Sequence, residues 1–140
     1  MNRLGAIVFV ATFSLFFVTG VYWCYAMFFP YGWTFPQIEC ATETIDLGSV
    51  DGENSFPCEF IVTNTGNAPL EIVEIRPGCG SCLAIRDYPK SPIPSGEKGV
   101  ISVSLLTEGL SGSVKKSFLV RSNDPRRPFL LLTIQAEVIK

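Results

Sequence analysis

The feature that most constrains the fold is a turn-forming stretch that separates two strand-like runs. The stretch reads Asn64-Thr65-Gly66-Asn67-Ala68-Pro69-Leu70, and the run before it, Phe56 to Thr63, places hydrophobic residues at every second position. Gly66 and Asn67 can adopt a positive φ at low cost, which is the backbone geometry that many tight turns require. The pattern therefore predicts two β-strands joined by a turn.

The same alternation, punctuated by glycine and proline, recurs along the rest of the chain. The residues from Leu70 to Ile75 alternate imperfectly, which indicates a bulge or two covered faces. No stretch after residue 29 has helical periodicity. About seven short strands within about 100 residues are typical of an antiparallel β-sandwich of immunoglobulin type. The expected strands lie at 42–50, 56–63, 70–75, one short edge strand within 83–98, and 100–106, 114–120 and 129–139.

The chain begins with a long uncharged segment. The 26 residues from Leu4 to Phe29 are apolar or small, whereas about 20 in a helix span a hydrocarbon core of about 30 Å. Aromatic residues, among them Trp23 and Trp33, gather at the far end of the segment, where they favour a membrane interface. The sequence predicts one N-terminal transmembrane anchor; a cleaved signal peptide is the alternative, although Cys24-Tyr25-Ala26 is a poor cleavage site.

The predicted organisation has three parts. Residues 1–29 form the anchor and 30–41 form a spacer, rich in proline and aromatic residues, close to the membrane. Residues 42–140 form the β-sandwich. We expect the sandwich to lie outside the cytoplasm, on the periplasmic side of a single-pass membrane protein.

Composition excludes several classes of function. All 13 Asp and Glu residues follow the anchor, and the folded part carries a net charge of about −3, so there is no basic surplus for nucleic acid. Histidine is absent, which removes the usual general base and the usual imidazole ligand. Phosphate-binding loops and zinc-protease motifs are also absent. We expect no enzyme, no cofactor, no metal site and no small-molecule substrate.

Cysteines are the residues with chemical potential. Cys24 lies in the anchor, and four others lie beyond it: Cys40, Cys58, Cys79 and Cys82. In an exported domain, four cysteines most often form two disulfides, with three possible connectivities. The favoured arrangement pairs Cys79 with Cys82 and Cys40 with Cys58.

The Cys79 and Cys82 pair also has two chemical interpretations. A Cys-x-x-Cys pair serves thiol redox when a cation or helix N-terminus lowers a thiol pKa, but Arg76 and Arg86 are the nearby cations and no helix is predicted to follow. Soft-metal binding, for example of copper, is the other interpretation. Zinc is weaker still, because the four cysteines contain one close pair and such sites usually have two.

A basic group surrounds one predicted strand and its turn. It consists of Lys115, Lys116, Arg121, Arg126 and Arg127. Charges of this kind usually form a solvated outer face that protects sheet edges from aggregation. Attraction to anionic lipid headgroups or an acidic partner is the functional interpretation.

Several motifs, in order along the chain, resemble those of one bacterial family. The family is domain-of-unknown-function family fifteen seventy-three, related to the immunoglobulin-like domains of the Hydin and ASH type. The resemblance covers about residues 42–140 and implies a seven-stranded sandwich, often exported and tethered, with no activity established. The motifs are Asn64 to Leu70, Cys79-Gly80, Ile93-Pro94-Ser95-Gly96-Glu97, Ile101-Ser102-Val103 and Val120-Arg121-Ser122-Asn123-Asp124-Pro125.

Two functional hypotheses follow. The first is a membrane-anchored, extracytoplasmic immunoglobulin-like module that binds other envelope proteins through sheet edges or loops, without catalysis. The alternative is a thiol-redox or copper-handling envelope protein that uses Cys79 and Cys82. Serine at both positions would abolish activity only in the alternative.

Overall fold

A computed structural model of the chain describes residues 19–21, 23 and 34–139, and it divides the chain into two compact units, Met1–Trp33 and Thr34–Lys140. In the first unit, Thr19 to Val21 and Trp23 are helical. No helix among the described residues is long and apolar enough to cross a membrane. The predicted anchor, residues 4–29, lies almost entirely outside the described residues, so it stays a prediction.

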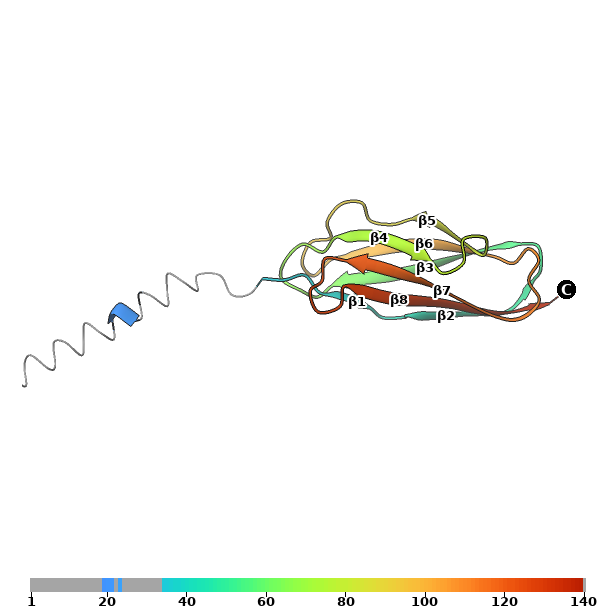
Figure 1. Cartoon of the computed structure of the whole chain (residues 1–140), viewed down its shortest axis with the longest axis horizontal. Coiled ribbons are helices and arrows are strands. Elements are labelled where there is room, and N and C mark those ends of the chain that lie inside the picture. Colours follow the sequence, from blue (N-terminus) through green and yellow to red (C-terminus); the bar gives the residue numbers. More distant parts are fainter. Residues whose placement is uncertain (1–18, 22, 24–33, 140) are drawn as a thin grey trace, which may run out of the picture. The chain divides into compact units, whose positions relative to one another are not determined.

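The second unit is built from strands that form two four-stranded sheets (Figure 1). Sheet A has the order β1-β3-β6-β5 and sheet B has the order β2-β8-β7-β4. The strands are β1 (Ile38–Cys40), β2 (Thr44–Asp51), β3 (Ser55–Asn64), β4 (Ile72–Pro77), β5 (Leu83–Asp87), β6 (Lys98–Leu106), β7 (Gly112–Ser122) and β8 (Phe129–Ile139). The β-sandwich expected from the sequence is therefore confirmed.

The core lies between the two sheets and is filled by the inward parity of each strand. In β3, Cys58, Phe60 and Val62 are buried while the residues between them are exposed. Phe60 from sheet A meets Phe118 from sheet B edge to face, with ring centroids 5.3 Å apart. Such an aromatic pair adds about 1 kcal/mol to what its buried area contributes, so these two rings help to fix the sheets against each other.

Two details differ from the expected seven antiparallel strands. The structure has an additional strand, β1, which falls within the segment expected to be a spacer and pairs with Val62 to Asn64 of β3. The chain then changes sheets, and β2 runs parallel to β8. Periodicity reports which face of a strand is buried but not the direction of its neighbour, so the parallel pair was not predictable from alternation. Of the two alternatives for residues 70–75, a bulge or two covered faces, the structure has the bulge, because the register of β4 shifts between Ile72 and Glu74.

The turn after β3 is organised by the fully buried side chain of Asn64. Its Nδ2 donates to the carbonyl oxygens of Ala68, at 2.8 Å, and Ile93, at 2.9 Å. Its Oδ1 accepts the backbone N–H of Gly66 at 3.0 Å. Buried amides of this kind must be satisfied, and Asn64 achieves this by joining the turn to the loop before β6.

The explanation based on positive φ is wrong for this turn. Among the described residues, the glycines with positive φ are Gly48, Gly96, Gly109 and Gly112. Gly66 is needed for space instead: a Cβ there would meet the carbonyl oxygen of Phe35 and come within 2.5 Å of the nitrogen of Gln37. The glycine lets the segment before β1 pass directly over the turn.

Candidate functional site

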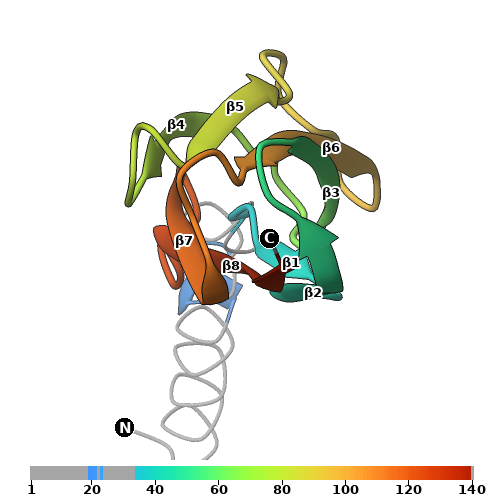
Figure 2. The same ribbon diagram turned by 90° about the vertical axis from the view of Figure 1, so that its right-hand side faces the viewer.

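The predicted cysteine loop joins the edge of one sheet to the edge of the other. Residues 78–82 connect β4 in sheet B to β5 in sheet A, and these two strands lie side by side (Figure 2). The Gly78 N–H donates to the carbonyl oxygen of Ser117 at 2.9 Å, and the Leu106 N–H donates to that of Cys82, also at 2.9 Å. The loop is therefore fixed by backbone bonds to β7 and to the end of β6.

Cys79 and Cys82 form a disulfide within this loop, as predicted. Cys82 is buried and Cys79 is half-buried. The two arginines that could activate a thiol are engaged elsewhere: Arg76 pairs with Glu74 at 2.8 Å, and Arg86 donates to the hydroxyl of Ser104 at 3.0 Å. A strand rather than a helix N-terminus follows Cys82, so the usual means of lowering a thiol pKa is not present at this loop.

The predicted disulfide between Cys40 and Cys58 is wrong, because both cysteines are free and buried. Cys40 lies opposite Val62 of β3, and Cys58 lies four residues before Val62 on that strand. At about 3.3 Å per residue this offset is roughly 13 Å, whereas a disulfide needs Cα atoms closer than about 7 Å.

These two thiols fill the core rather than carry chemistry. Burial raises the pKa of Cys40, and a backbone hydrogen bond at Thr42 opposes this rise only in part. The Cys40 thiol donates to the carbonyl oxygen of Thr42 at 3.2 Å. Burial likewise raises the pKa of Cys58. Protonated, buried thiols are poor nucleophiles and poor metal ligands. Within the described part of the chain, no three His, Cys, Asp or Glu residues are grouped so that they could hold a metal ion.

The predicted basic group is divided by the length of β7. Lys115 and Arg121 share the outer face of this strand, but they are six positions apart along it, which is roughly 20 Å. Lys116 lies on the other parity and is half-buried. Arg126 stacks over the ring of Phe35 at 4.3 Å, and Arg127 binds the carboxylate of Glu43 at 2.8 Å. The five cations therefore do not form one continuous patch.

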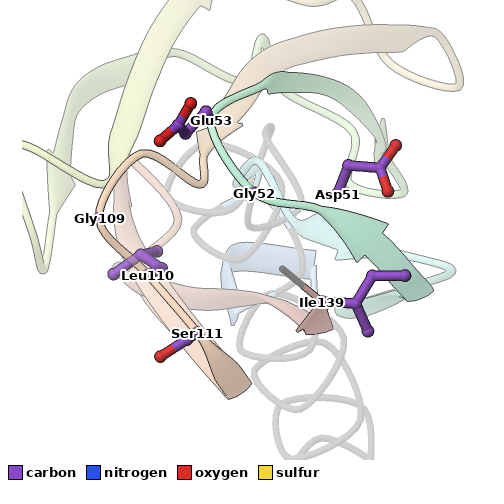
Figure 3. Close-up of a pocket in the computed structure, with 7 residues that line it drawn as sticks. All are labelled: Asp51, Gly52, Glu53, Gly109, Leu110, Ser111 and Ile139. Carbon is purple, nitrogen blue, oxygen red and sulfur yellow. The ribbon is translucent and has the colours of Figure 1, made fainter.

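A hollow lies at the end of the sandwich where β8 ends (Figure 3). It has a volume of about 600 Å³ and is lined by the turns after β2 and β6 together with Ile139. Its two carboxylates, Asp51 and Glu53, point to opposite sides. Because they do not converge, the hollow lacks the closely placed polar groups that define a ligand site.

An exposed apolar patch on the outer face of sheet B is the feature that the sequence analysis missed. The patch consists of Leu119, Phe129 and Leu131. Phe129 is 54% exposed and Leu131 is 55% exposed, while Leu119 is half-buried. Leu119 and Leu131 are direct cross-strand partners. The available signal was that Phe129 and Leu131 share the parity of the polar residues Thr133, Gln135 and Glu137 in the last strand.

The fold and the disulfide loop define a class of protein, an immunoglobulin-like sandwich of two four-stranded sheets. Its first strand, β1, belongs to sheet A and its second, β2, to sheet B. The family model described as "Protein of unknown function (DUF1573)" matches residues 38–138. The chain belongs to this family, which confirms the resemblance seen in its motifs. No curated protein matches the chain.

Solved structures share the fold at low sequence identity. A protein of unknown function from Porphyromonas gingivalis W83 is 20% identical, with a TM-score of 0.65 over 78% of this chain and 50% of that one. The secreted serine protease VesC from Vibrio cholerae is 18% identical, with a TM-score of 0.55 over 72% of this chain and 23% of that one. The ASH/PapD-like domain 7 of human CEP192 is 11% identical, with a TM-score of 0.54 over 79% and 90%. This chain thus spans half or less of the first two proteins.

Proposed function

We propose that this protein is a membrane-tethered module that binds other proteins of the cell envelope and performs no catalysis. The observation that carries the proposal is the apolar patch on sheet B. Outward sheet positions are ordinarily polar, and full burial of one leucine or phenylalanine side chain contributes about 1.5 to 3 kcal/mol. Contiguous exposed apolar residues mark interaction surfaces, and this patch holds three on two neighbouring strands, β7 and β8.

The rim of the patch has the chemistry of a protein interface. Arg121 lies directly opposite Phe129, and Arg76 lies opposite Leu119. Arginine and aromatic residues are enriched where proteins meet, and they dominate the binding energy there. Glu74 pairs with Arg76 and lies opposite Arg121, so the rim carries two arginines against one carboxylate and would attract an acidic group on the partner.

The tether and the location rest on two further observations. Residues 4–29 are long and apolar enough to span a bilayer, and the sandwich begins at Thr34, only a few residues later. The disulfide between Cys79 and Cys82 favours an oxidising compartment, since cytosolic thiols are kept reduced. Both observations support an extracytoplasmic domain held close to the membrane surface.

Photo-crosslinking of the full chain in its own membranes tests the proposal. With p-benzoylphenylalanine at position 131, we expect a discrete crosslinked species with another envelope protein, and Phe129→Ser should abolish it. The same photoreactive residue at Ile139 is the matched control, because Ile139 is 49% exposed on the same strand but lies at its other end. Equal crosslinking at both positions, or none at position 131, would contradict the proposed surface.

A further inference from the structure

The four sheet edges are not equally protected. Three of them, the edges formed by β2, β4 and β5, carry a break in register. The breaks fall between Asp46 and Ser49 in β2, between Ile72 and Glu74 in β4, and between Ile85 and Asp87 in β5. Bulges bend an edge away from an incoming strand and are a common protection against unwanted pairing. The fourth edge, formed by β1 and β3, has no break: β3 pairs with β6 without a shift from Ser55 to Thr63.

Most of this fourth edge is open. The short strand β1 pairs with Val62, Thr63 and Asn64, and along residues 55–61 no described strand pairs with the same side of β3. The Thr65 N–H donates to the carbonyl oxygen of Gln37 at 2.9 Å. In an antiparallel pair, alternate residues direct their N–H and C=O groups to the same side. The backbone groups of Ile61 and Glu59 therefore point to the open side, in line with β1.

Pro57 fits this arrangement. It lies on the same parity as Glu59, so its missing N–H removes no bond to β6. Proline at this position protects one end of the open edge and keeps its carbonyl oxygen as an acceptor. Two complete pairs of backbone groups, those of Glu59 and Ile61, remain available beside it.

The side chains along the edge carry a charge preference. Glu39 of β1 and Glu59 of β3 are exposed, and Ile61, which lies between their positions, is 50% exposed. Neither carboxylate forms an ion pair within residues 34–139. The stretch Ser55–Ile61 contains no Lys or Arg, so a second copy of the same edge would bring another Glu59 rather than a cation. Like charges on paired strands oppose each other.

We propose that the open edge of β3, from Pro57 to Ile61, accepts an extended segment of another protein as an added strand in line with β1. The N–H and C=O groups of Glu59 and Ile61 supply the backbone bonds. A Lys or Arg of the partner lies opposite Glu59, and an apolar residue lies opposite Ile61. This inference rests on the proposed binding function and assigns it a second surface and a partner chemistry.

Hydrogen exchange measured by NMR on the full chain in detergent micelles tests the open edge. The Glu59 and Ile61 amides should exchange faster than those of Phe60 and Val62, which face β6, by on the order of 100-fold or more. Uniform protection along all four amides would show that the edge is already covered and would overturn the proposal.

Selection of random 12-residue displayed peptides on the same full chain tests the partner chemistry. We expect enriched peptides to alternate apolar and polar residues, to carry Lys or Arg, and to protect the Glu59 and Ile61 amides. Glu59→Lys should change the selected charge to Asp or Glu. Glu59→Pro and Ile61→Pro remove N–H groups that make no bond in the free chain, so they should weaken binding by about tenfold or more while leaving thermal unfolding nearly unchanged.

Val100→Thr is the matched control, because Val100 lies opposite Ile61 on β6 and is not part of the open edge. This substitution should leave the affinity for the selected peptide unchanged. Failure to select any peptide, or proline variants that bind the selected peptide as tightly as the unaltered chain does, would overturn the added-strand proposal. The crosslinks from position 131 would be unaffected by that failure, so this inference and the proposed function can fail separately.

Discussion

The carboxylate of Asp124 accepts the backbone N–H of Ile38 at 2.9 Å, although 86 positions separate the two residues in sequence. The same side chain accepts the N–H groups of Arg126, at 2.7 Å, and Arg127, at 3.1 Å. One buried carboxylate thus fastens β1 to the turn between β7 and β8. The Ser122-Asn123-Asp124-Pro125 motif therefore has a structural role, because it holds β1 against the turn between β7 and β8.

Asp124→Ala should lower the free energy of unfolding by about 2 to 4 kcal/mol, because three N–H groups lose their acceptor and the one from Ile38 is buried. Urea denaturation of the full chain in detergent measures the change. Asp46→Ala is the control: Asp46 accepts the Gly48 N–H at 2.8 Å but is exposed, so this substitution should destabilise the fold much less than Asp124→Ala. Equal losses in the two variants would contradict the role given to Asp124.

Stability should also depend on pH through Asp124. Burial alone would raise the pKa of this carboxyl group, but the three backbone N–H groups and the charge of Arg126 hold it below its usual value. Its folded pKa then lies below its unfolded pKa of about 3.9. The stabilisation is fully present above the unfolded pKa and is lost as pH falls through the folded pKa.

The urea midpoint of the wild type should therefore fall more steeply below about pH 4 than that of Asp124→Asn. Hydrogen bonds also lower the pKa values of Asp46 and Glu74, so these two groups add acid sensitivity to both proteins. The difference between the two pH profiles therefore reports on Asp124 alone. Parallel pH profiles would exclude Asp124 as a source of the acid sensitivity.

Gly66→Ala should destabilise the sandwich by about 1 to 3 kcal/mol or more, because the added methyl group overlaps the backbone of Phe35 and Gln37. Gly80→Ala provides the control, since a Cβ at Gly80 meets nothing within 4 Å. Thermal unfolding monitored by circular dichroism should separate the two variants. A midpoint for Gly66→Ala equal to that of Gly80→Ala would show that the segment before β1 moves freely aside.

Replacing both Cys79 and Cys82 with serine should cost about 2 kcal/mol, as the chain-entropy model predicts for so short a loop. Denaturation with and without reductant measures this cost, and the serine variant should not respond to reductant. Crosslinking from position 131 should persist. If crosslinking disappeared while stability stayed the same, the thiol-redox alternative would replace the binding function.

The sequence predicted those strands whose own residues alternate, such as β3, β7 and β8. It did not predict β1, because a strand of three residues is held by distant partners, namely Asp124 and the pairing with β3. The bulge in β4 was visible because a shift of register moves hydrophobic residues to the other parity.

The candidate site was harder to predict, because pairing depends on register. Cys40 and Cys58 both face the core from neighbouring strands, which made a disulfide plausible, yet an offset of four residues forbids it. The basic residues are close in sequence, but an extended strand separates its ends. The apolar patch depends on which strands are adjacent: Leu119 and Leu131 become neighbours only when β7 pairs with β8.

The parallel pairing of β2 with β8 has a mechanical consequence. Both strands run from the end of the sandwich where the chain enters, at Thr44 and Phe129, towards the opposite end, at Asp51 and Ile139. A force that pulls the start of β2 away from the far end of β8 would therefore load the bonds between these two strands in shear. The bonds would share such a load instead of opening one after another.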